Sequence, residues 1–261
     1  MILAALASSG SLEDATDLLQ RPGPLQLLIQ GVVLLAVGLA LTWLIGIKAN
    51  RLSWADLRYE RGPRATRGFG AGLLLGALAA VAAMLLAIAA GTAHWADDTG
   101  HAAGYASAVS RTLAILAPAA LAEEVLFRGV PLVLLASAFG RAPALLAVAV
   151  AFGVGHLNNP NALALGIVNI VLAGIFLGLA FYAPGGIWTA FGAHLGWNGA
   201  LAALDAPVSG LPFRIPVIDY VPGTPVWLTG GAFGPEGGLA ATMAFGAAAY
   251  AVVRRSRKES A

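Results

Sequence analysis

The sequence predicts an all-α fold, a polytopic bundle of membrane-crossing helices, and three observations carry this prediction. Of the 261 residues, 59% are hydrophobic and 11% are charged, whereas soluble domains average roughly 25% charged residues. Apolar windows of about 20 residues, enough to cross a hydrocarbon core roughly 30 Å thick, recur along most of the chain. Leu, Ala, Val and Ile dominate these windows without a period of two, which favours helices over a transmembrane β-barrel.

We predict about seven spans, with eight as the alternative. They cover residues 25–47, 69–92, 108–137, 143–157, 162–183, 186–205 and 237–253. The fourth is short for a crossing, so we expect it to tilt or to extend into its flanks. Because these windows leave no room for a soluble domain, residues 1–261 are interpreted as a single integral membrane domain.

The basic residues predict how the chain is oriented. Six of the 15 Lys and Arg lie within residues 48–67, and four more lie within 254–258. The positive-inside rule places both segments in the cytoplasm, and seven spans put them on the same side. We therefore predict a multi-pass protein of the cell membrane whose 48–67 connection and C-terminus are cytoplasmic. These cations flank spans and have no interleaved aromatics, so the expected partner is the lipid bilayer and not nucleic acid.

The longest connection, residues 207–238, contains six prolines. A segment of this length is either an inert connector or a lid over a site. An earlier connection holds His94 and His101 beside two aspartates, and we expect both histidines to be solvated.

Three short polar patterns interrupt the apolar windows, although an ionisable side chain at bilayer depth costs roughly 2.5 to 3.5 kcal/mol. The first is Glu123-Glu124-x-x-x-Arg128. On a helix, Glu124 and Arg128 share one face in the favourable acid-before-base order, whereas Glu123 points about 100° away. One interpretation is a structural ion-pair cluster in which Arg128 compensates both carboxylates. The other is that Glu124 and Arg128 fix the helix, while Glu123 faces an internal cavity as a general base.

The second pattern is Phe152-x-x-x-His156, at the end of an apolar run, and the third is His194-x-x-x-Asn198. The spacing puts His194 and Asn198 one turn apart on one helix face. Structural interpretations exist for both patterns, because a histidine at a helix end is typically solvated or capped, and polar side chains in spans also join helices. Co-occurrence favours a functional site, since all acidic residues and histidines within the predicted spans, apart from Asp205 at the last position of one span, fall within the three patterns.

In this order on successive helices, the three patterns resemble the motifs of the CAAX protease and bacteriocin-processing enzyme (CPBP, or ABI) family. The best understood members of that family are the type II CAAX prenyl proteases. The resemblance covers residues 108–205, which are therefore expected to form the protease core.

The resemblance implies a role for each matching residue. Glu123 and His156 would hold and activate a water molecule, and His194 and Asn198 would stabilise the oxyanion formed at the scissile carbonyl. The supporting residues would be Glu124, Arg128 and Phe152. This assignment agrees with the chemistry of peptide hydrolysis, which needs a base for water and donors aimed at the developing oxyanion.

The same side chains leave a metal-dependent mechanism open. Glu123, His156 and His194 form a ligand set known for catalytic zinc with water in the open position. Members of the family have been described both as glutamate-dependent proteases and as metalloproteases. No cofactor is certain, and zinc is the candidate. The chain has no cysteine, no His-Glu-x-x-His and no Gly-x-Ser-x-Gly, which excludes other protease designs.

The predicted function is therefore an intramembrane endopeptidase acting on a membrane-associated protein or peptide. The alternative is a non-catalytic membrane scaffold, or a bacteriocin-immunity factor, that binds a peptide in the same cavity. A solute transporter with a Glu and His proton relay is disfavoured, because the sequence has no inverted repeat of broken helices.

Overall fold

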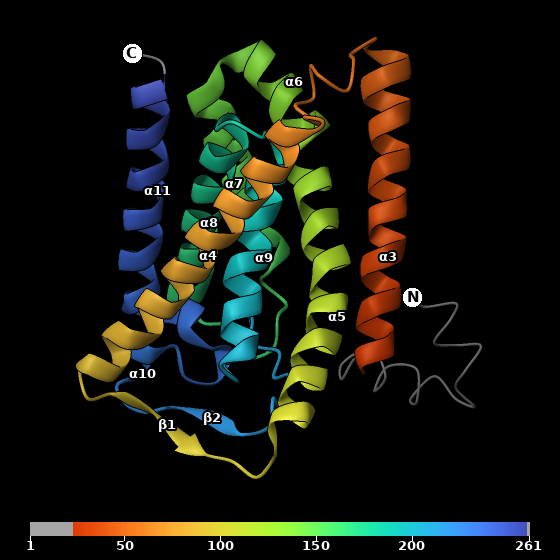
Figure 1. Ribbon diagram of the computed structural model, residues 1–261. Helices are drawn as coiled ribbons and strands as arrows, with labels where there is room; N and C mark the ends of the chain where they lie inside the picture. The colour runs from red at the N-terminus through yellow and green to blue at the C-terminus, as the bar shows by residue number, and fades with distance from the viewer. Residues whose placement is uncertain (1–22, 260–261) are drawn as a thin grey trace.

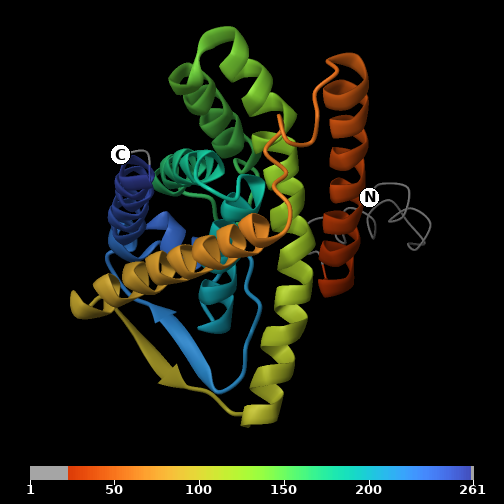
Figure 2. The same cartoon turned by 45° about the horizontal axis from the view of Figure 1, so that its top comes forward.

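The computed structural model describes residues 23–259 and is mostly helical (Figures 1 and 2). The long helices are α3 (Pro24–Leu41, continued by a π-helix over Thr42–Ala49), α4 (Pro63–Ala89), α5 (Ala102–Arg128), α6 (Val130–Phe139), α7 (Arg141–Gly155), α8 (Ala164–Tyr182), α9 (Ile187–Ala203) and α11 (Leu239–Glu259). Among the described residues, three helices have the length and hydropathy of a membrane span: α3 with its π-helical continuation, α4 and α8. The helical fold and its membrane character are thus confirmed, and the number of spans stays a prediction.

The predicted span 108–137 is not continuous, because the chain breaks between α5 and α6 at Gly129. The amide of Gly129 donates to the carbonyl oxygen of Glu124 at 3.2 Å, which closes the last turn of α5. Pro131 lies in the first turn of α6, where its missing N–H costs no helical hydrogen bond. As a result α6 turns away from α5 and forms a helical hairpin with α7 (Figure 2).

The all-α prediction also missed a small antiparallel ribbon. It pairs β1 (Ala93–Asp97) with β2 (Ile218–Pro222). His94 therefore lies in a strand, not in a loop, although its side chain and that of His101 are exposed as expected. The segment after β2 is ordered by α10 (Val226–Thr229) and by two 3₁₀ turns over Gly231–Phe233 and Pro235–Gly237.

The two basic segments lie at the same end of the molecule, opposite the ribbon (Figure 1). The connection from α3 to α4 is tied to this end by Arg58, whose guanidinium donates to the carbonyl oxygens of Phe181, Tyr182 and Ala183. These carbonyls end α8, where a cation is also favoured by the helix dipole. This arrangement fits the predicted orientation, in which both segments share one side.

Helix α9 is the central helix, and α4 crosses it at very short range. Gly72 and Gly76 face α9, where an added Cβ would overlap backbone atoms of the partner helix, and a Cβ on Gly68 would overlap Gly185, just before α9, and the Thr189 side chain. Helix α9 contributes Gly192 and Gly196, whose Cβ positions would overlap carbonyl oxygens of α4. Small residues four apart allow this close approach between membrane helices.

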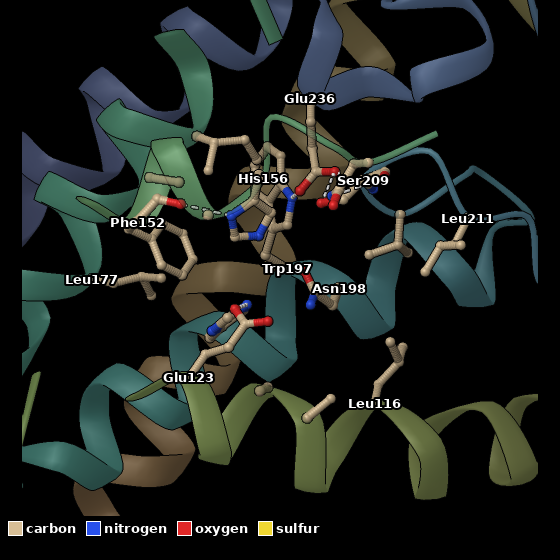
Figure 3. Close-up of a pocket in the computed structure, with 18 of the residues that line it drawn as sticks. Leu116, Glu123, Phe152, His156, Leu177, Trp197, Asn198, Ser209, Leu211 and Glu236 are labelled. Atoms are coloured by element: carbon tan, nitrogen blue, oxygen red, sulfur yellow. Dashed lines mark hydrogen bonds and ion pairs between the residues drawn. The ribbon is translucent and has the colours of Figure 1, made fainter. Parts of the chain in front are cut away.

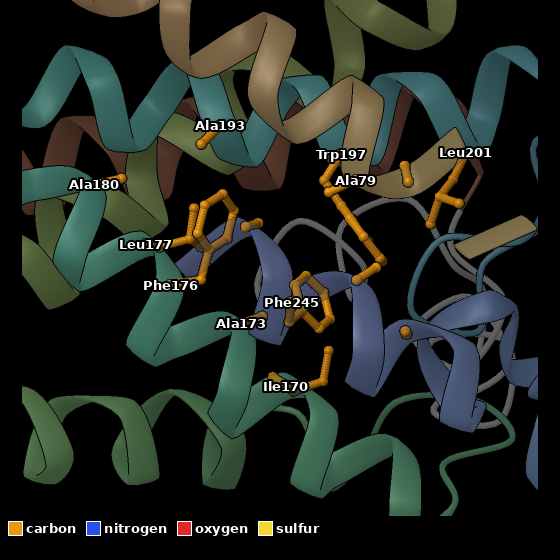
Figure 4. Close-up of a cluster of buried hydrophobic side chains, with 14 of the residues drawn as sticks. Ala79, Ile170, Ala173, Phe176, Leu177, Ala180, Ala193, Trp197, Leu201 and Phe245 are labelled. Atoms are coloured by element: carbon orange, nitrogen blue, oxygen red, sulfur yellow. The ribbon is translucent and has the colours of Figure 1, made fainter. Parts of the chain in front are cut away.

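The apolar core between α8, α9 and α11 is built around aromatic rings (Figure 4). Phe245 of α11 lies with its ring centroid 4.1 Å from that of Trp197 and 6.3 Å from that of Phe176. Through these contacts α11 supports the face of α9 that carries the polar residues of the third pattern.

We predict that Gly76→Ala destabilises the protein by about 1 to 3 kcal/mol, the usual cost of overpacking. The new methyl group would meet the Ala193 carbonyl oxygen and force α4 away from α9. Gly70→Ala is the matched control, because a Cβ on Gly70 meets nothing within 4 Å. Thermal unfolding in detergent measures both variants, and equal stability would contradict the close packing.

Candidate active site

A cavity of about 370 Å³ lies between α3, α5, α7, α8 and α9 and collects the cavity-facing residues of the three patterns (Figure 3). The predicted residues that line it are Glu123, Phe152, His156, His194 and Asn198. Glu124 and Arg128 do not line it, since both are fully buried behind its wall. The structure therefore brings the three patterns together and separates the two neighbouring glutamates.

The buried residues form a chain of charged contacts across two helices. Arg128 Nη1 lies 3.1 Å from Glu124 Oε1, and the same oxygen lies 2.8 Å from His194 Nδ1. Arg128 also donates to the Gly174 carbonyl oxygen of α8 at 3.4 Å. Its guanidinium lies 4.3 Å from the ring centroid of Phe152, a cation–π contact. Glu124 thus joins α5 to α9, while Arg128 joins α5 to α7 and α8.

Glu123 has a different environment from Glu124. Its side chain is 28% exposed, and its Oε2 lies 3.7 Å from His194 Nε2. This oxygen has no hydrogen-bond partner, although it is buried. In Figure 3 the carboxylate points into the cavity toward His156, with Asn198 beside both. The other oxygen, Oε1, is not buried in this way, so it is the one that a water in the cavity can reach with a hydrogen bond.

Hydrogen bonds to the two Nδ1 atoms assign the tautomers of the histidines. His156 Nδ1 lies 2.7 Å from the Phe152 carbonyl oxygen, and His194 Nδ1 bonds the Glu124 carboxylate. Both partners are acceptors, so each Nδ1 carries a proton. In the neutral ring each Nε2 therefore carries the lone pair, and it becomes a donor only when the ring is charged.

The zinc alternative needs a third ligand beside these two Nε2 atoms. Across residues 23–259, no three His, Cys, Asp or Glu side chains lie close enough together to hold a metal ion. Glu123, His156 and His194 are therefore not gathered as three close ligands here, and zinc stays a predicted candidate cofactor. The choice between a glutamate-dependent and a metal-dependent mechanism stays a prediction.

Glu236 is a cavity residue that the sequence analysis missed. Its Oε1 accepts a hydrogen bond from Trp197 Nε1 at 3.0 Å, and its Oε2 accepts from the amide and the hydroxyl of Ser209. Burial raises the pKa of the Glu236 carboxyl, and the hydrogen bonds from Ser209 and Trp197 oppose that rise. The predicted seventh span began at residue 237, so this carboxylate was left in the connection. Its position between glycines and a proline gave no signal of burial.

Glu236 gives the connection 207–238 a structural role at the site. It holds Ser209, whose carbonyl oxygen accepts a hydrogen bond from Asn159, close in sequence to His156. Val208, Ser209 and Leu211 line the cavity with Glu236. The connection is therefore part of the cavity wall and more than an inert connector.

Fold and cavity together define a helical membrane protein with a polar site enclosed by its helices. Residues 105–200 match the family model described as Rce1-like, type II CAAX prenyl endopeptidase Rce1-like. This match confirms the resemblance predicted from the motifs and supports placing the chain in the CAAX protease (CPBP) family. The matched residues run from α5 to α9 and include all three patterns. No curated protein and no solved structure matches the chain.

We predict that Arg128→Met destabilises the protein by roughly 3 to 5 kcal/mol, because it leaves the Glu124 charge buried without its cation. Adding Glu124→Gln should recover most of this loss, since no uncompensated charge then remains. Arg111→Met, at an exposed position of the same helix, is the control. Thermal unfolding measures the four proteins, and a double variant no more stable than Arg128→Met would contradict the role of the ion pair.

We predict that Glu236→Gln costs roughly 1 to 3 kcal/mol, the usual penalty for unsatisfied buried polar groups. A glutamine has one acceptor oxygen, whereas Ser209 and Trp197 present three donors to the carboxylate. The side-chain NH2 group of the glutamine would then face one of these three donors instead of an acceptor. Asp219→Asn, at an exposed position of β2, is the matched control. An unchanged melting temperature for Glu236→Gln would contradict the assigned hydrogen bonds.

Proposed function

We propose that this protein is an intramembrane endopeptidase that hydrolyses a peptide bond of a membrane-associated protein or peptide. The observation that carries the proposal is the position of Glu123. Its side chain lines the cavity and is 28% exposed, with Oε2 3.7 Å from His194 Nε2, whereas the Glu124 side chain is fully buried in an ion pair with Arg128. The family match supports a membrane endopeptidase, and the environment of Glu123 supports water activation at this carboxylate.

The proposed mechanism uses the side chains of the cavity. A water bound between Glu123 and His156 gives a proton to the Glu123 carboxylate as its oxygen attacks the scissile carbonyl carbon. The new C–O bond forms while the carbonyl electrons move to oxygen. The resulting oxyanion accepts hydrogen bonds from the Asn198 amide and from His194 Nε2–H. The proton on Glu123 then passes to the departing amine nitrogen as the C–N bond breaks.

The tautomer of His194 adds a condition to this mechanism. Because Nδ1 already donates to Glu124, Nε2 can donate to the oxyanion only when the ring is an imidazolium. Two carboxylates lie next to that charge, Glu124 at 2.8 Å and Glu123 at 3.7 Å. In the proposed mechanism Glu124 is therefore a positioning residue that holds the orientation of the ring and compensates its charge.

We further propose that the protein lies in the cell membrane with the 48–67 connection and the C-terminus in the cytoplasm. The excess of Lys and Arg in these segments supports this orientation. Their location at the same end of the bundle supports it as well (Figure 1).

We predict that Glu123→Gln lowers kcat/KM by about 10² to 10⁴, the usual contribution of a general base. Asn198→Ala should cost about 10² to 10³, as expected for one oxyanion donor. The substrate is found by comparing peptide ends in membranes of cells that express the wild type or Glu123→Gln. A synthetic peptide spanning the cleaved bond is then assayed with purified proteins.

Asp97→Asn is the control for this experiment, because Asp97 is an exposed carboxylate of β1 outside the cavity. It should cleave the peptide as the wild type does. Equal cleavage by the wild type and Glu123→Gln would exclude Glu123 from the reaction. If no peptide end depends on Glu123, and the cellular effect of the gene is retained both in Glu123→Gln and in a folded His194→Ala variant, the scaffold alternative is favoured.

A further inference from the structure

A second cavity of about 570 Å³ lies in a crevice between α4 and α11, above residues of α8 and α9. In Figure 1 these helices lie close together near the ribbon and separate toward the end that holds the C-terminus. We call it the basic crevice, because three arginines lie at its wide end: Arg64 and Arg67 of α4 and Arg255 of α11. No Asp or Glu is among the described residues that line it.

The apolar depth of the crevice follows from how α4 packs. Glycines hold one face of α4 against α9, and Leu74, Leu75 and Leu78 of α4 line the crevice. Leu74 and Leu78 line the crevice and remain 62% and 57% exposed. The floor consists of small residues of α8 and α9, among them Ala180, Ala183 and Ala193. None of these side chains is large enough to fill the space between the two helices.

The charge at the wide end fits an anion at the membrane surface. The three guanidinium groups come from two different helices, and guanidinium binds phosphate oxygens well through paired N–H donors. They lie at the end where both basic segments gather, which is the end expected to meet anionic headgroups. The basic crevice therefore has arginines at its wide end and an apolar interior. A phospholipid matches both features, with an anionic headgroup and apolar acyl chains.

We propose that the basic crevice binds one anionic phospholipid, with its phosphate among Arg64, Arg67 and Arg255 and an acyl chain between α4 and α11. Basic pockets between membrane helices are a recurring way to bind such headgroups. The three arginines and the leucines of the crevice do not line the catalytic cavity, so the proposal holds whether or not the protein is a peptidase.

The test is native mass spectrometry of the full-length protein in mild detergent with equimolar phosphatidylglycerol and phosphatidylcholine. The wild type should retain one phosphatidylglycerol in clear preference. The triple variant Arg64→Gln, Arg67→Gln and Arg255→Gln should reduce this occupancy by about tenfold. The control triple variant Arg51→Gln, Arg61→Gln and Arg254→Gln removes the same charge at exposed positions outside the crevice and should retain the lipid.

Ala71→Phe tests the apolar half of the site without changing any charge, since Ala71 lines the crevice. The Ala71→Phe variant should also lose the lipid. An excess of glycerol phosphate, which lacks acyl chains, should not displace the lipid from the wild type. Equal retention of both lipids by the wild type would overturn the proposal. Equal loss in the two triple variants would overturn it as well, by showing a response to net charge alone. Circular dichroism confirms that each variant is folded.

Discussion

The contact on which the rest of the site depends is the buried chain Arg128–Glu124–His194. Glu124 and Arg128 are fully buried, and their ion pair offsets part of the desolvation cost of both charges, although Glu124 Oε2 and Arg128 Nε have no hydrogen-bond partner. The partner of Glu124 on α9 is 70 residues away in sequence, so the hydrogen bond between Glu124 Oε1 and His194 fixes the rotation of α9 against α5. The same rotation turns Glu123 to the cavity, because adjacent helical residues lie about 100° apart. One carboxylate is thus used for structure, and its neighbour is left for the proposed role in catalysis.

Hydropathy and charge predicted the helical membrane fold because these properties depend on local composition. They failed where a local break or a distant pairing decides the structure. Gly129 and Pro131 divide one apolar window into α5 and α6, and hydropathy does not record such a break. The ribbon joins β1 to β2, more than a hundred residues apart in sequence, so neither strand is evident from its own sequence. Arg58 was counted as a cation at the membrane surface, whereas it caps α8.

The residues of the site were easier to predict than their partners. Charged and polar side chains stand out in apolar helices, which made Glu123, His156 and His194 visible from sequence. Their hydrogen bonds follow from tertiary packing, so the tautomers of the two imidazoles became assignable only in the structure. Glu236 illustrates the opposite case, since a carboxylate in a Gly- and Pro-rich connection resembles any solvated turn residue. Its burial depends on α9 and on Ser209, which local sequence does not reveal.

Helix α9 separates the catalytic cavity from the basic crevice, and the separation is thin. Ala193 lines both cavities, and the next residue, His194, carries the imidazole of the site. The carbonyl oxygen of Ala193 also meets Gly76 of α4, so α4 cannot move toward α9 without disturbing this turn. A lipid between α4 and α11 would therefore press on the outer face of the helix whose inner face positions His194 and Asn198. In this geometry the packing of α4 helps to determine the shape of the candidate active-site cavity, although no residue of α4 lines that cavity.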